Sequence, residues 1–153
     1  MRQFECVLLV DDDPISNFIN KKIVKSLMTV DNLHEAKNGM EALDYIENYI
    51  ETKKDCLPEI ILLDINMPII NGYEFLEVLK ANYPHLTSKI VVLTSSDSEE
   101  DQIKMNELGS DYFITKPLTK EKLAEIIRDK IKWFWTFVYV ELCIFDAIPK
   151  LRK

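Results

Sequence analysis

Glu59-Ile-Ile-Leu-Leu-Asp64 is an apolar run that ends on an acidic residue. A strand with one face in water alternates apolar and polar residues, whereas the interior of this run is apolar throughout. Two further runs have the same character, namely Cys6-Val-Leu-Leu-Val10 and Lys89-Ile-Val-Val-Leu-Thr94. We therefore predict three parallel strands that other elements cover on both faces.

Two weaker strand candidates and several amphipathic stretches surround these runs. The weaker strands are Tyr112-Phe-Ile-Thr115 and, as an edge strand, residues 32–36. The amphipathic stretches repeat apolar residues at helical spacing: Ile15, Phe18, Ile19, Ile23, Val24 and Leu27; Leu43, Ile46 and Ile50; Phe75, Leu76 and Leu79; Leu123, Ile126, Ile127 and Ile131. Residues 98–108 hold only Ile103, Met105 and Leu108 as apolar residues, which predicts a thinly anchored, exposed helix.

Strand and helix thus alternate five times along the chain. This order predicts a doubly wound, five-stranded parallel α/β sheet with helices on both faces, because the crossovers are right-handed. The three glycines, Gly39, Gly72 and Gly109, all fall at predicted junctions, where positive φ or close packing is needed. We find neither an internal repeat nor a flexible linker.

The composition is that of a globular protein with a core, since 47% of the 153 residues are hydrophobic and 29% are charged. The net charge of −7 argues against a nucleic-acid binder, because phosphate backbones select Lys and Arg. The start of the chain lacks a signal-peptide pattern, and no window reaches the ~18 apolar residues of a membrane span. We therefore expect a cytoplasmic location.

The pattern of cysteines and histidines predicts no disulfide and no metal site. Cys6, Cys56 and Cys143 are an odd set without paired spacing, so neither a disulfide framework nor a zinc-ligand pattern is expected. Buried thiols in a reducing cytosol are the simpler interpretation. His34 and His85 have no partners in sequence, so we expect them at surface or edge positions rather than as ligands.

Reactive side chains follow the predicted strands at the end where ligands bind in parallel α/β sheets. In chain order they are Asp11, Asp12, Asp13, Asp64, Thr94, Ser95 and Lys116. Clustered carboxylates suit Mg²⁺, a single carboxylate can attack phosphorus, and a lysine with a hydroxyl can bind phosphoryl oxygens. The pattern predicts a phosphoryl site, although Asp13-Pro14 is better explained as a helix start with Asp as N-cap.

The order of these motifs resembles the receiver domain of two-component response regulators, of the chemotaxis-regulator type. The matching motifs are Val10-Asp-Asp-Asp13, Asp64-Ile-Asn-Met-Pro68 with Gly72, Thr94-Ser95 and Lys116-Pro117. The resemblance implies a single receiver domain over residues 1–132 with a flavodoxin-like sheet in strand order 2-1-3-4-5. It implies a histidine kinase or histidine phosphotransfer protein as donor, a downstream protein partner, and no metabolite turnover.

The resemblance also assigns roles to individual residues. Asp64 would be the phosphoacceptor, and Lys116 would pair with Asp64 before phosphorylation and with a phosphoryl oxygen afterwards. Mg²⁺ would be bound by Asp12 directly, by Asp11 through water, by Asp64, and by the main-chain carbonyl of Asn66. Thr94 would hydrogen-bond the phosphoryl group and move toward it on activation.

Further implied roles concern switching and lifetime. Phe113, three residues before the lysine, would be the switch residue, and the Lys116–Pro117 bond would be cis. Asn66, Ser95 and Ser96 would tune the lifetime of the phosphoryl group, for which we expect an intermediate value. Activation would move the loops after the fourth and fifth strands and the face formed by the fourth helix, fifth strand and fifth helix.

One alternative is a Mg²⁺-dependent phosphatase of the haloacid dehalogenase type. Asp11 and Asp13 imitate its Asp-x-Asp motif, and a Thr and a Lys follow later. Against it, Ile15 stands where a Thr or Val is expected, the chain lacks room for a cap and the late acidic pair, and Asp64 would have no role.

Residues 133–153 form an aromatic C-terminal tail that reads unlike the rest of the chain. It holds Trp133, Phe134, Trp135, Phe137, Tyr139 and Phe145, and it is too short for an independent domain. Three interpretations stay open: packing on the receiver, a homodimer contact, or contact with a membrane surface. The basic face of an interfacial helix is missing, which favours packing or dimerisation.

Overall fold

The structure is a computed structural model, and it describes residues 2–128 of the chain. The chain divides into two compact units, Met1–Lys120 and Glu121–Lys153. The predicted aromatic tail, the domain boundary at residue 132, Ile131 and Cys143 lie outside the described residues. Within residues 2–128, no helix is both long and apolar enough to cross a membrane.

The first unit is built on the predicted parallel sheet. Its strands are β1 (Arg2–Val10), β2 (Met28–Ala36), β3 (Ile60–Asp64), β4 (Lys89–Thr94) and β5 (Tyr112–Thr115). They are arranged in the order β2-β1-β3-β4-β5 with every pair parallel, which confirms the flavodoxin-like topology. Two strands begin earlier than predicted, because Arg2 pairs with Met28 and extends the β1–β2 ladder toward the start of both strands.

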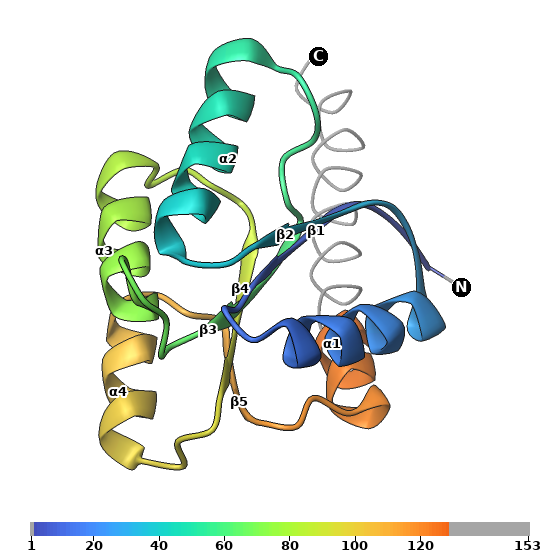
Figure 1. Ribbon diagram of the computed structural model, residues 1–153, viewed down its shortest axis with the longest axis vertical. Coiled ribbons are helices and arrows are strands. Elements are labelled where there is room, and N and C mark those ends of the chain that lie inside the picture. Colours follow the sequence, from blue (N-terminus) through green and yellow to red (C-terminus); the bar gives the residue numbers. More distant parts are fainter. Residues whose placement is uncertain (1, 129–153) are drawn as a thin grey trace, which may run out of the picture. The chain divides into compact units, whose positions relative to one another are not determined.

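Helices lie on both faces of this sheet (Figure 1). α1 (Pro14–Leu27) lies on one face, and α2 (Gly39–Thr52) and α3 (Gly72–Asn82) lie on the other, followed along the chain by α4 (Glu99–Glu107). Residues 120–128 are also helical, and Leu123, Ile126 and Ile127 on this segment are buried. The predicted five helices are therefore all present.

The central strands are buried as predicted. Every residue of β3 and five of the six residues of β4 are buried. One core cluster fills the space between the sheet and the helices α2 and α3, and its largest members include Leu8, Ile46, Ile61, Leu63, Phe75, Leu76 and Leu79. This continuous packing on both sides explains why the apolar runs do not alternate.

The apolar stripe predicted on α1 is buried only in its second half, where Val24 is buried and Ile23 and Leu27 are half-buried. The helix buries Asn17, Asn20 and Val24. The apolar side chains of its first half are exposed: Ile15 at 68%, Phe18 at 58% and Ile19 at 46%. Apolar periodicity shows which residues share a face but not which face meets the sheet, and here the Asn17 side chain is held inward because its Nδ2 donates to the Asp11 carbonyl at 2.7 Å.

Helix α4 and the glycines agree with the predictions. Met105 is the buried residue of α4, and Ile103 is 59% exposed, so few apolar contacts hold this helix. Gly39 and Gly72 open α2 and α3, and Gly109 follows α4 with a φ of +89°. All three glycines lie at junctions between elements.

Gly72 is needed because it packs directly on the end of β3. A Cβ atom at this position would lie 2.5 Å from the Asp64 carbonyl oxygen and 2.8 Å from the Ile65 Cα, and neither backbone atom can move aside cheaply. We expect Gly72→Ala to lower the free energy of unfolding by about 2 kcal/mol in urea titrations, as overpacking does. Glu77→Ala, at an exposed position of the same helix, is the control, and equal stability of both variants would contradict this account.

Candidate functional site

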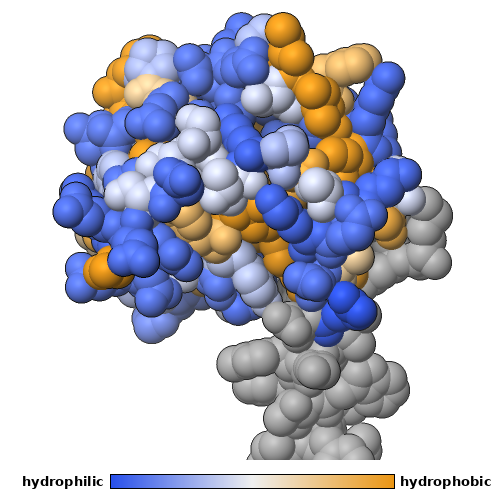
Figure 2. Space-filling view, turned by 90° about the horizontal axis from the view of Figure 1, so that it is seen from below, coloured by the Kyte–Doolittle hydropathy of each residue, from blue (hydrophilic) through white to orange (hydrophobic). Residues whose placement is uncertain are grey.

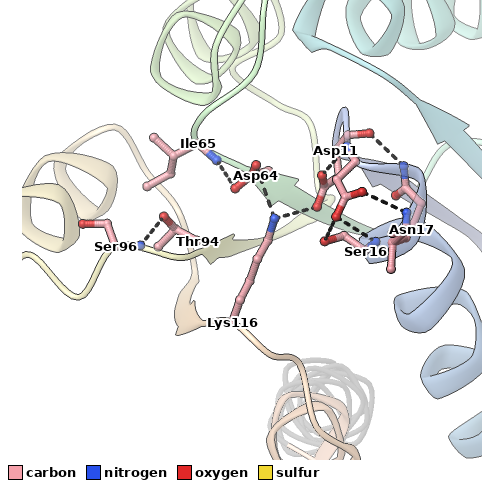
Figure 3. A network of polar contacts seen from close by, with 10 residues as sticks. Asp11, Ser16, Asn17, Asp64, Ile65, Thr94, Ser96 and Lys116 are labelled. Carbon is pink, nitrogen blue, oxygen red and sulfur yellow. Dashed lines mark hydrogen bonds and ion pairs between the residues drawn. The ribbon is translucent and has the colours of Figure 1, made fainter.

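The reactive side chains meet at the carboxyl edge of the sheet (Figure 3). Asp11 follows β1, Asp64 and Thr94 are the last residues of β3 and β4, and Lys116 follows β5. Adjacent parallel strands end at the same edge, so residues far apart in sequence become neighbours there. Asp11, Asp64 and Thr94 are buried, and the Lys116 side chain is 22% exposed.

Lys116 connects the two buried carboxylates. Its Nζ donates to Asp11 Oδ2 at 2.7 Å and lies 3.3 Å from Asp64 Oδ2. Figure 3 shows the lysine side chain reaching up to lie between the two acids. The resemblance implied the pair with Asp64, and the structure adds Asp11 as the nearer partner.

The charges at this edge do not balance. Burial raises the pKa of Asp64 above its ordinary value; the positive charge of Lys116 opposes this rise and the negative charge of Asp11 adds to it. Burial alone would lower the pKa of Lys116, but its hydrogen bond to Asp11 and the charge of Asp64 raise it above the ordinary value. Lys116 therefore stays charged, whereas ionised Asp64 is stabilised incompletely.

Backbone and amide groups hold the two carboxylates in place. Asp11 Oδ1 accepts from the Asp13 backbone N–H at 2.9 Å, and Asp64 Oδ1 accepts from the Ile65 backbone N–H at 2.9 Å. Asn17 Nδ2 donates to the Asp11 carbonyl at 2.7 Å, which ties α1 to the end of β1. Sequence reasoning missed Asn17, and the available signal was a pair of asparagines, Asn17 and Asn20, three residues apart among the apolar residues of the first half of α1.

The three aspartates after β1 have different surroundings. Oxygens of Asp11, Asp12 and Asp64 lie within 4.8 Å of one another, and Asp12 is exposed. Asp13 instead caps α1: its Oδ1 accepts from the Ile15 N–H at 3.0 Å and its Oδ2 from the Ser16 hydroxyl at 3.0 Å. The hydrogen bond from Ile15, with those from Ser16, holds the pKa of Asp13 below its ordinary value. Asp13 is thus the helix cap and Asp12 the third member of the acidic group.

The remaining residues of the site lie in the loops after β3 and β4. Thr94 Oγ1 accepts from the Ser96 backbone N–H at 3.0 Å. Ser95 is exposed and Ser96 is half-buried, and Asn66, two residues past Asp64, is exposed. All three small polar residues therefore lie in the loops that follow β3 and β4 at the carboxyl edge of the sheet.

Phe113 lies away from the acidic group, on β5. Its side chain is half-buried, and it lines a hollow of about 330 Å³ between α4 and β5. The other lining residues are Gln102, Ile103, Asn106, Ser110, Asp111 and Tyr112. The Lys116–Pro117 peptide bond is cis, as predicted.

Comparisons with known proteins agree on one family. The family model of the response regulator receiver domain matches residues 7–128. The sensor histidine kinase CheAY of Helicobacter pylori is 32% identical over 82% of this chain, which spans 15% of that protein's length. The response regulator Rcp1 of Synechocystis is 29% identical, with 84% of this chain and 87% of Rcp1 covered. A two-component response regulator from Cytophaga hutchinsonii has a TM-score of 0.77 and 31% identity over 86% of this chain and 99% of its own.

The phosphatase alternative is not supported. The matching family model is the receiver and not the haloacid dehalogenase. The second aspartate of the imitated Asp-x-Asp motif, Asp13, uses both oxygens to cap α1. Asp64, which that alternative leaves without a role, lies in the acidic group beside Lys116.

The raised pKa of Asp64 predicts a pH dependence of stability. The pKa of Asp64 is higher in the folded state than in the unfolded state, so this group makes the protein less stable as pH rises. The loss of stability begins near pH 4, the usual pKa of an unfolded aspartate, and ends above the raised pKa of the folded state. Asp64→Asn lacks this group. In buffer without divalent cations, we expect its free energy of unfolding, relative to wild type, to increase across that window and to be level above it.

The measurement is urea unfolding at a series of pH values. Asp44→Asn is the matched control, because it changes the same group at an exposed position of α2. A relative stability that decreased with pH would mean that the attraction of Lys116 outweighs the cost of burying Asp64.

Proposed function

Because the chain belongs to the response regulator receiver domain family, we propose that it accepts a phosphoryl group on Asp64 and thereby switches a protein-interaction face. The observation that carries this proposal is the contact of Lys116 with both buried carboxylates. The donor would be a phosphohistidine of a histidine kinase or histidine phosphotransfer protein. The module would carry out only its own phosphorylation and dephosphorylation and would turn over no metabolite.

The proposed reaction is a phosphoryl transfer from nitrogen to oxygen. A carboxylate oxygen of Asp64 forms a bond to phosphorus, the bond between phosphorus and the donor histidine nitrogen breaks, and its electron pair stays on that nitrogen. Lys116 and the Thr94 hydroxyl would stabilise the phosphoryl oxygens. Because of its ion pair with Asp64, Lys116 is charged and already lies beside the carboxylate that would react.

The acidic group fits Mg²⁺ by its chemistry. Asp11, Asp12 and Asp64 offer three carboxylate oxygens within 4.8 Å, and hard oxygen ligands suit this ion. When bound, the ion would neutralise the charge on the phosphoryl oxygens. The main-chain carbonyl of Asn66 would complete the protein ligands.

Apolar side chains beside the site support a protein donor. Figure 2 shows hydrophobic side chains reaching one face of the molecule among hydrophilic ones. Ile15, Phe18 and Ile19 on α1 are exposed, and Ile69 in the loop after β3 is 74% exposed. Ile69 also has a φ of 71°, which β-branched residues rarely adopt. Both segments begin at the acidic edge, so a donor that contacts them would reach Asp64.

The downstream partner would contact the α4–β5 face. Phosphorylation adds about −1.5 to −2 charge beside Lys116, which is three residues from Phe113. The hollow that Phe113 lines is bounded by α4, a helix with few buried contacts. A small shift of α4 or of Phe113 would change the shape of this face. Phe113 has no hydroxyl, so its switch would report packing alone.

The proposed location of the protein is the cytoplasm. Cys6 and Cys56 are free and buried, as suits a reducing cytoplasm. The acid excess of the chain gives no support to direct binding of nucleic acid. The phosphoryl lifetime would be intermediate, set by the small polar side chains of Asn66, Ser95 and Ser96.

The phosphoacceptor is tested with a small acyl phosphate and Mg²⁺. We expect the wild type to gain the mass of one phosphoryl group, and hydroxylamine to remove it as it does from acyl phosphates. Asp64→Asn should gain none, because its amide is not a nucleophile toward phosphorus. Asp13→Asn should still be labelled, since Asn also caps helices. A label that persists in Asp64→Asn, or catalytic consumption of many equivalents of donor, would refute the proposal.

Magnesium binding is tested by thermal or urea unfolding. At ten times its Kd the ion should raise the free energy of unfolding by about 1.4 kcal/mol, because it binds only the folded chain. We expect Asp12→Asn to lose this gain and Asp13→Asn to keep it. An equal response of both variants would show that the ion does not use the proposed ligands.

A further inference from the structure

A second group of potential metal-ligating side chains lies beside the middle of β1. Cys6 lies on β1, His34 on β2 and Cys56 in the connection between α2 and β3. One potential ligand atom from each of the three lies within 4.8 Å of the other two. The sequence spacing hides this group, because parallel strands bring together residues that are 22 to 50 positions apart.

Tyr45 of α2 contacts all three of these side chains. Its hydroxyl oxygen lies 3.4 Å from Cys6 Sγ and 3.7 Å from Cys56 Sγ, and it donates a hydrogen bond to the Cys56 carbonyl at 2.8 Å. Its ring stacks on His34 with centroids 4.6 Å apart. His34 Nε2 is buried and has no hydrogen-bond partner among residues 2–128.

These distances are close to those of a tetrahedral zinc site. Bond lengths of about 2.3 Å to sulfur and 2.1 Å to oxygen give tetrahedral edges of about 3.6 Å between sulfur and oxygen and about 3.8 Å between sulfurs. The two sulfur–hydroxyl distances, 3.4 Å and 3.7 Å, lie on either side of the first edge. The Tyr45 hydroxyl could turn a lone pair to the cation while it keeps its hydrogen bond to the Cys56 carbonyl.

Ligand chemistry and charge select the same ion. Thiolate and imidazole are the ligands of Zn²⁺ and do not suit Mg²⁺. Two thiolates and a neutral imidazole around a dication give a net charge of zero, so the buried site avoids the cost of an unpaired charge.

We propose that Cys6, His34 and Cys56 bind one zinc ion, with the Tyr45 hydroxyl at the fourth position. The two thiols lose their protons to solvent as the bonds to zinc form. The ion would join β1, β2, α2 and the segment that leads into β3. It is independent of the acidic edge, since Cys6 precedes Asp11 by five residues of extended chain, or about 16 Å.

The test uses Co²⁺ as a spectroscopic substitute for zinc in the full chain, after chelation and reduction. Mg²⁺ in excess keeps the acidic edge occupied. We expect one Co²⁺ per chain, with thiolate-to-cobalt charge-transfer absorption and tetrahedral d–d bands, displaced by Zn²⁺. The midpoint of thermal unfolding should rise with Zn²⁺. Folded wild type without charge-transfer absorption would overturn the proposal.

Variants then assign the ligands. Cys56→Ser and His34→Gln, each shown to be folded by circular dichroism, should weaken Co²⁺ binding at least about tenfold, since even the loss of a group that only orients a ligand costs 10–100-fold. Cys143→Ser, His85→Gln and Asp64→Asn should bind as wild type does. An unchanged spectrum in both ligand variants would overturn the proposal. Loss of the spectrum in Cys143→Ser or Asp64→Asn would place the ion elsewhere and overturn it equally.

Discussion

The site depends on one ammonium group, that of Lys116, which lies 2.7 Å from Asp11 Oδ2 and 3.3 Å from Asp64 Oδ2. Two carboxylates taken out of water repel each other, and a single positive charge compensates only one of them. Burial is the main cause of the raised pKa of Asp64, and the negative charge of Asp11 adds to it while Lys116 opposes it. Negative charge therefore remains at the carboxyl edge, where the proposed divalent cation and phosphoryl group would bind.

The backbone around Lys116 links this charge balance to a distant face. The Lys116 N–H donates to the Thr94 carbonyl at 2.7 Å, and β5 continues back from Lys116 to Phe113. Beyond Phe113 lies α4, which is held by buried Met105 and by a polar contact in which the Tyr73 hydroxyl donates to Asp101 at 2.5 Å. Because a polar contact at a partly exposed position is inexpensive to break, the proposed switch needs little energy to act on α4.

The two groups of potential metal ligands differ in their coordination chemistry. The carboxyl edge presents the hard oxygens of Asp11, Asp12 and Asp64, whereas the group beside the middle of β1 presents the softer sulfur and nitrogen atoms of Cys6, His34 and Cys56. If both proposals hold, this difference would let two different cations bind the domain without competing. The proposed zinc ion would fix the middle of β1 to β2 and α2, and leave the acidic edge free to change.

The sequence by itself determined the parallel sheet, the strand ends and the acidic residues that follow them, because doubly covered strands are apolar without alternation and parallel strands end at one edge. It did not determine the orientation of α1: the stripe with Ile15, Phe18 and Ile19 implied burial, and the contact of Asn17 with the Asp11 carbonyl turned it outward. Nor did it show the cluster of Cys6, His34, Tyr45 and Cys56. Local patterns show which side chains share a face of an element, but only the pairing of β1 with β2 and β3 decides which distant side chains come within reach of one ion.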